Sequence, residues 1–243
     1  MRNIKTLSGL ASPRASLRGA GSGFSTGIQH IFSDFAPGDG GSATYEAGLD
    51  LSGSGLRRGD LMIAIAYAGA FWGQDSSGAY GTTEITTPGW DLVHTEVNVG
   101  GMRVYLRVSS GDEGQIDATG LRNGGLYVSI LRGAEYPSAA DIAGSQFVAS
   151  AVGGDRTEAI PAMADQSFAS VACLFGSGAV DQPLYIGAVG STLPSRGGAI
   201  IHKGSRSASS LLLHGPVASG ALRAERSTSI GEFIVARIGL RES

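Results

Sequence analysis

The chain has 243 residues, of which 42% are hydrophobic and 39 are glycine. This length suits one large domain or two small ones, and the apolar content supports a packed core, which excludes disorder of the whole chain. The net charge of −3 comes without the clustered Lys and Arg that phosphate binding needs, so we expect no nucleic-acid partner. Abundant glycine with few helix-favouring residues indicates strands separated by tight turns.

Residues 1–27 are predicted to form an extended arm, because they are too rich in glycine for a stable helix and too polar for a core. The arm carries Arg2, Lys5, Arg14 and Arg18 and no acidic residue. It lacks the continuous apolar core of a secretory signal, so we expect synthesis in the cytoplasm of the host cell. An Arg- and Ser-rich transit peptide is the alternative.

Residues 23–27 of this arm read Gly-Phe-Ser-Thr-Gly and match the G-x-S-x-G pattern of a serine hydrolase. That motif needs an apolar strand before it and a helix after it, and the sequence predicts neither. We therefore attribute the match to the local composition.

Beyond the arm, apolar segments separated by turn residues predict strands in two sets. The first set comprises 28–35, 44–51, 61–68, 90–97, 102–108 and 126–131. After a connection at 135–144, the second set comprises 147–151, 158–160, 168–175, 184–189, 199–203, 209–214 and 230–238. Together they predict an all-β, antiparallel, jelly-roll-like sandwich over residues 28–243.

Two of these strands differ in their pattern. Residues 61–67 are apolar throughout, which predicts a central strand covered on both faces. In 102–108, Val104, Leu106 and Val108 alternate with polar or amphipathic residues, which predicts a half-exposed antiparallel strand.

The segments 125–132 and 231–238 resemble each other, and each closes one set of strands. A duplicated sheet plan, with similar halves near 28–135 and 145–243, would explain the similarity. Chance similarity between β-rich segments would explain it as well.

Residues that could carry chemistry are dispersed. The single cysteine, Cys173, lies in an apolar run, which excludes an internal disulfide and predicts a buried thiol. The histidines, at 30, 94, 202 and 214, lack the spacing of a metal-binding pair, and no carboxylates are paired by spacing. We therefore expect no catalytic residues, no cofactor and no metal. The longest apolar stretch, 61–72, is too short to span a membrane as a helix, so we expect no membrane insertion.

Two further motifs have structural interpretations. Arg58-Gly59-Asp60 spells an adhesion tripeptide but directly precedes an apolar strand, where we expect Gly-Asp to form the entry turn. Trp90 follows a Pro-Gly turn and is interpreted as a core anchor. Aromatic residues of the loop 71–83 are better placed to stack on a sugar, and they define a candidate ligand surface: Phe71, Trp72 and Tyr80.

Four segments carry a resemblance to a known group of proteins. In order, they are Gly-Asp-Leu-Met-Ile-Ala-Ile-Ala at 59–66, Pro-Gly-Trp-Asp-Leu-Val at 88–93, Val-Tyr-Leu-Arg-Val at 104–108 and Gly-Leu-Tyr-Val-Ser-Ile-Leu-Arg-Gly at 125–133. This series resembles bacteriophage and prophage structural proteins. The resemblance implies a β-sandwich of jelly-roll character in a virion appendage, fibre or head decoration. It covers about residues 59–133 and brings no ligand or catalytic residues with it.

The leading hypothesis is a non-enzymatic virion structural protein, a decoration, fibre or spike component bound to capsid or tail subunits through its arm. The arm residues expected to make this contact are Arg2, Lys5, Arg14, Arg18 and Phe24. By analogy, we expect a homo-oligomer, with a homotrimer first. A carbohydrate- or host-receptor-binding module is the second hypothesis. A hydrolase of cell-surface polymer is the third, and it requires carboxylates or a Ser-His pair to converge on folding.

Overall fold

A computed structural model describes the chain over the following ranges: 27–38, 45–69, 83–96, 100–122, 124–153, 157–163, 167–176, 184–188, 200–203, 206–214, 216–226 and 230–243. These ranges hold strands in two consecutive groups of eight, with two short helices in the second group.

The first group comprises β1 (Gln29–Pro37), β2 (Ala47–Asp50), β3 (Leu61–Gly69), β4 (Glu84–Ile85), β5 (Asp91–Glu96), β6 (Gly100–Val108), β7 (Gln115–Thr119) and β8 (Gly125–Arg132). The second group begins with α1 (Ala139–Gly144) and comprises β9 (Gln146–Gly153), β10 (Thr157–Ile160), β11 (Phe168–Gly176), β12 (Leu184–Ala188), β13 (Ile200–Lys203), β14 (Arg206–His214), α2 (Pro216–Ser219), β15 (Leu222–Arg226) and β16 (Ile230–Leu240).

The two groups have the same strand order. The first forms a five-stranded sheet, β1-β8-β3-β6-β5, and a three-stranded sheet, β2-β7-β4. Adding eight to each number gives the sheets of the second, β9-β16-β11-β14-β13 and β10-β15-β12. All the pairings are antiparallel, and each half follows the jelly-roll order, except that its fifth strand joins the sixth in the larger sheet. The predicted antiparallel, jelly-roll-like sandwich is confirmed.

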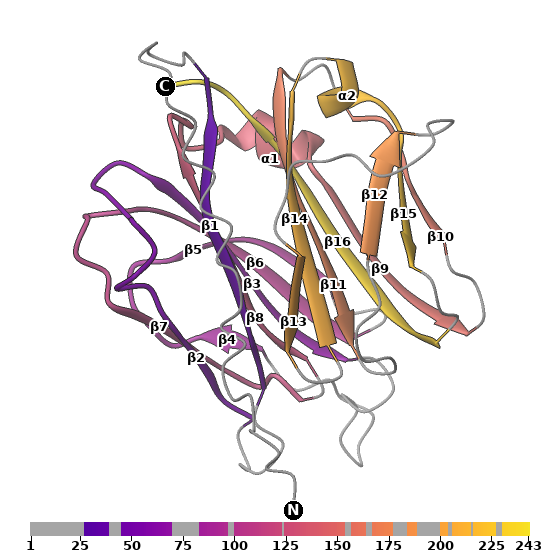
Figure 1. Ribbon diagram of the computed structural model, residues 1–243, viewed down its shortest axis with the longest axis horizontal. Coiled ribbons are helices and arrows are strands. Elements are labelled where there is room, and N and C mark those ends of the chain that lie inside the picture. Colours follow the sequence, from indigo (N-terminus) through magenta and orange to yellow (C-terminus); the bar gives the residue numbers. More distant parts are fainter. Residues whose placement is uncertain are drawn as a thin grey trace, which may run out of the picture.

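The four sheets stack in layers, with the five-stranded sheets face to face in the middle and a three-stranded sheet on each outer side (Figure 1). At one edge of the paired central sheets, β1 packs on β13 and β14. At the opposite edge, β5 meets β9, and the His94 and Phe147 rings stack there. If the two halves are exchanged, β1 takes the place of β9, and β13 takes the place of β5. The contact of β1 with β13 is then replaced by the contact of β9 with β5. The halves are therefore related by an approximate twofold axis.

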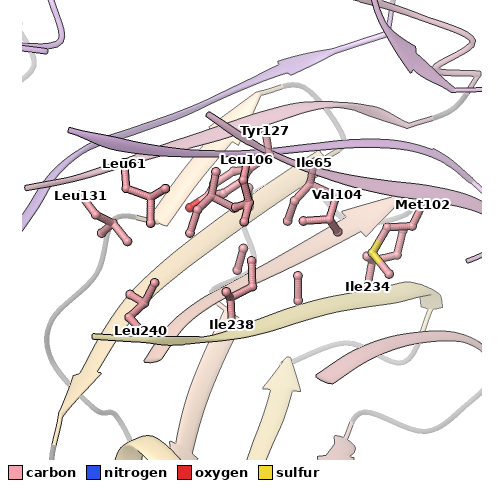
Figure 2. Close-up of a cluster of buried hydrophobic side chains, with 14 of the residues drawn as sticks. Leu61, Ile65, Met102, Val104, Leu106, Tyr127, Leu131, Ile234, Ile238 and Leu240 are labelled. Carbon is pink, nitrogen blue, oxygen red and sulfur yellow. The ribbon is translucent and has the colours of Figure 1, made fainter. Parts of the chain in front are cut away.

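The central interface is apolar. Figure 2 shows side chains of the first sheet facing Ile234, Ile238 and Leu240 of β16. Two further clusters fill the spaces between each five-stranded sheet and its outer sheet. Residues 61–67 of β3 are at most 2% exposed and contribute to clusters on both faces of their sheet, so the prediction of a doubly covered central strand is confirmed.

The alternation predicted for 102–108 is correct only in part. Val104 and Leu106 are buried in the central interface, as expected. Tyr105, on the opposite face, is also buried, because the outer sheet β2-β7-β4 covers it. Val108 is 48% exposed because it lies at the end of β6, outside the interface.

Candidate functional site

Asp60 is 2% exposed, and its carboxylate ties the start of β3 to the end of β8. Arg132, the last residue of β8, donates to it from Nε at 2.9 Å and from Nη2 at 2.7 Å. The backbone N–H of Arg57 donates a third hydrogen bond at 2.8 Å. Arg132 also donates to the Gly55 carbonyl. A carboxylate that accepts three hydrogen bonds inside the protein agrees with the predicted strand-entry role of the Arg-Gly-Asp tripeptide.

Arg107 of β6 makes a second connection of this kind. Its Nη1 donates to the Pro88 carbonyl at 3.0 Å, and its Nη2 lies 3.1 Å from Glu113 Oε1. Burial opposes ionisation of Glu113, but hydrogen bonds from Ser109 and Ser110 outweigh it and lower the pKa to about 2. The Pro-Gly-Trp turn is thereby fixed to β6.

Arg237 of β16 occupies the place in the second half that Arg132 occupies in the first. Gln29 is opposite Arg132 in the β1–β8 ladder, and Gln146 is opposite Arg237 in the β9–β16 ladder. Arg237 is fully buried and donates to the carbonyls of Pro161 and Ala218. Desolvation lowers its pKa to about 10. In each half, then, an arginine near the end of the eighth strand holds the loop between the second and third strands.

Helix α1 is fixed between the halves by Asp141. Ser138 and Asp141 form a capping box at its N-terminus. Arg241, just after β16, donates to both carboxylate oxygens of Asp141, with a shortest distance of 2.9 Å. The end of the second half is thus tied to the start of that half.

A polar cluster lies where β1 packs on β14. Ser33 Oγ is 2.6 Å from His30 Nε2, 3.1 Å from the Tyr127 hydroxyl and 3.0 Å from Ser210 Oγ. Desolvation lowers the pKa of His30 below its ordinary value. A Ser-His pair therefore does form, within β1, and both of its members also lie within hydrogen-bonding distance of Ser210 in the other central sheet.

Two of the pockets on the described part of the chain lie apart from that cluster. One, of ≈ 520 Å³, lies where β5 meets β9 and is lined by Val93, His94, Ile142, Gln146, Phe147 and Pro161, among others. The other, of ≈ 420 Å³, lies on the outer sheet of the first half beside Glu46, Gln115 and Asp117. Neither pocket is lined by His30, Ser33 or Ser210.

Most of the predicted site residues lie outside the described residues. This applies to the arm residues Arg2, Lys5, Arg14, Arg18 and Phe24 and to the candidate ligand surface of Phe71, Trp72 and Tyr80. Trp90 is half-buried and packs against the core cluster of the first half, as a core anchor should. The backbone of Cys173 lies in β11, but its side chain is outside the described part.

Within the described ranges, no three His, Cys, Asp or Glu side chains are grouped so as to hold a metal ion. In the same ranges, neither helix is long and apolar enough to cross a membrane. Sequence reasoning missed His94 and Gln146, which come from different halves and meet only through the fold. No spacing rule would have selected them.

Comparison with known proteins adds no further constraint. No protein-family model, no curated protein and no solved structure matches this chain.

Proposed function

We propose that this chain is a non-enzymatic structural component of a bacteriophage or prophage virion, a decoration, fibre or spike protein. Its double sandwich forms the displayed body, and residues 1–27 attach it to a capsid or tail subunit. A jelly roll alone does not select this role, because the same fold serves many functions. The proposal therefore rests on the segments that carry the resemblance.

The observation that carries the proposal is that these four segments contact one another in pairs. Asp60 of the Gly-Asp-Leu segment binds Arg132 of the closing Arg-Gly segment. Pro88 of the Pro-Gly-Trp turn accepts a hydrogen bond from Arg107 of the Tyr-Leu-Arg-Val strand. The shared series thus corresponds to one structural unit, an eight-stranded half with its loops fixed. Chance similarity of separate β motifs would not require such contacts.

The position of Gly27 also supports the proposal. Gly27 lies beside Gly133 and the Glu242 side chain, and the Ser243 N–H donates to the Gly133 carbonyl. The arm therefore joins the body at the end where β8 and β16 terminate. Its four cations would match an acidic groove on the neighbouring subunit.

The direct test is deletion of residues 1–27. We expect a truncated chain that unfolds like the full chain but no longer incorporates into particles. A full-length variant with Arg2, Lys5, Arg14 and Arg18 replaced by Gln separates charge from length, and it should incorporate less well. Normal incorporation of the truncated chain would refute attachment through the arm. We also propose a homotrimer, which light scattering of the purified protein tests.

Two other functions remain proposals. A glycan- or receptor-binding module would use Phe71, Trp72 and Tyr80, and binding to a glycan array that Trp72→Ala abolishes would support it. The hydrogen bond between His30 and Ser33 favours the hydrolase hypothesis. Hydrolysis of cell-surface polymer that is lost in Ser33→Ala would establish that activity. Glycan binding is compatible with a virion location, whereas under the structural proposal the hydrolysis assay gives no signal.

A further inference from the structure

The pocket where β5 meets β9 contains two polar groups that the protein leaves unused. His94 Nε2 and Gln146 Oε1 are both buried and have no hydrogen-bond partner. Both residues line the pocket. Buried polar atoms are almost always paired in native proteins, so two exceptions at one site call for an explanation.

The neighbouring contacts fix both side chains. The His94 ring stacks on Phe147, with 3.9 Å between ring centroids and 11° between the planes. The Gln146 side-chain amide donates to the Ala162 carbonyl at 2.8 Å, which leaves Oε1 as an acceptor. The pocket therefore offers preformed polar positions that belong to different halves of the molecule.

The lining also defines the chemistry of a ligand. Val93, Ile142, Phe147 and Pro161 supply apolar surface, and none of the lining residues described carries a fixed charge. Desolvation lowers the pKa of His94, which favours a neutral imidazole near neutral pH. Such a site suits a molecule with an apolar body and a neutral, hydrogen-bonding head.

The equivalent edge of the central interface is built differently. At that edge, β1 packs on β13 and β14. There His30, Ser33, Tyr127 and Ser210 form a hydrogen-bonded cluster. The two equivalent edges of the central interface thus differ. The polar groups at the β1 edge are hydrogen-bonded to one another, whereas the β5 edge has a ≈ 520 Å³ pocket.

We propose that the pocket between β5 and β9 binds a small neutral molecule with an apolar body and a primary amide or hydroxyl head. The head hydrogen-bonds to Gln146 Oε1 and His94 Nε2, and the body lies against Ile142 and Phe147. This site does not depend on the proposed virion function.

The test uses the full chain, labelled with ¹⁵N, and benzamide as the probe. We expect saturable shifts of the His94 ring nitrogens and of the backbone amides of residues 93 and 147, with a dissociation constant in the millimolar range typical of so small a ligand. Toluene, which has the ring without the amide, should bind at least about fivefold more weakly, as the loss of a hydrogen bond implies. Equal binding of the two probes, or no shift up to the solubility limit of benzamide, would overturn the proposal.

Variants locate the site. His94→Phe keeps a ring on Phe147 but removes Nε2, and Gln146→Met removes Oε1; each should weaken benzamide binding about fivefold. His214→Phe is the matched control, since His214 is exposed on β14 and does not line the pocket, and it should bind normally. If either pocket variant fails to fold, the comparison of benzamide with toluene on the unaltered chain still decides. Unchanged binding in both folded pocket variants would refute the assignment.

Discussion

Arg132 and Asp60 are 72 residues apart in the chain, yet their side chains form two hydrogen bonds at 2.7 and 2.9 Å. Asp60 directly precedes β3, the central strand of the larger sheet of the first half, and Arg132 ends β8 beside it. The side chain of Asp60 is 3% exposed and that of Arg132 is 28% exposed. A buried carboxylate with three donors is thus matched to a cation that still reaches solvent.

Replacing Asp60 tests how much this pair stabilises the fold. Asp60→Asn preserves the shape but removes the charge, and we expect the free energy of unfolding to fall by about 2–4 kcal/mol. Urea denaturation measures it. Asp112→Asn is the control, because Asp112 is exposed in a turn, and it should change stability by less than about 0.5 kcal/mol. Equal effects of the two substitutions would show that the pair is not a structural anchor.

Arg237 should stabilise the fold through hydrogen bonds to backbone carbonyls and not through an ion pair. Arg237→Leu removes the donor to the Pro161 and Ala218 carbonyls and leaves them without it. We expect the free energy of unfolding to fall by about 1–3 kcal/mol, because the buried Ala218 carbonyl is left without this donor. Thermal and urea unfolding measure it, with Arg58→Leu at an exposed turn as the control. A stable Arg237→Leu protein would mean that apolar packing replaces those hydrogen bonds.

The stability of the protein should fall as the pH drops below about 6.5, the pKa of an unfolded histidine. Desolvation lowers the pKa of His30 in the fold, so the unfolded chain takes up the proton more readily. The stabilisation is complete above pH 6.5 and is lost as the pH falls towards the folded pKa. The free energy of unfolding, measured with urea at pH 7.5 and at pH 5.5, should differ less between these two pH values in His30→Gln than in the unaltered chain.

His214→Gln provides the control for that experiment, because His214 is exposed at the end of β14. It should retain the pH dependence of the unaltered chain. The same dependence in His30→Gln would show that the buried cluster does not control stability in this range. Loss of stability below pH 4.5 is a separate effect, since the depressed pKa of Glu113 contributes stability that is lost between about pH 4.5 and 2.

The sequence predicted the large central sheets better than the outer ones. Strands such as β3 and β11 are recognisable because their residues are almost all apolar. β7 reads Gln-Ile-Asp-Ala-Thr, with only Ile116 and Ala118 facing the core, so its short alternating pattern resembles a polar loop. β4, with two residues, and β15, with its charged residues, were missed for similar reasons. Helix α1 was missed because its six residues fall within a predicted connection.

The similarity between 125–132 and 231–238 has a structural counterpart. These segments fall on β8 and β16, which hold the same position in their respective sheets. By contrast, the contact between His94 and Phe147 joins strands of different halves, and no local pattern predicts it. Periodicity predicts which face of a strand is buried, whereas strand pairing and packing between sheets depend on contacts between segments far apart in the sequence.

The relation between the halves predicts that they associate when separated. Chains 1–135 and 136–243, produced together, should copurify as a one-to-one complex, because the central cluster joins their five-stranded sheets. Each chain alone should aggregate, since it exposes a large apolar face. Ile238→Asp in the second chain should abolish copurification, because Ile238 is 2% exposed in that cluster. Val108→Asp, at a position that is 48% exposed, should not.

The most direct test of the central proposal is cryo-electron microscopy of the native particle from which this chain derives. We expect the four-layered body at the particle surface, with residues 1–27 in contact with a neighbouring capsid or tail subunit. A particle population without this body, or a body whose first 27 residues contact no other subunit, would contradict the proposal.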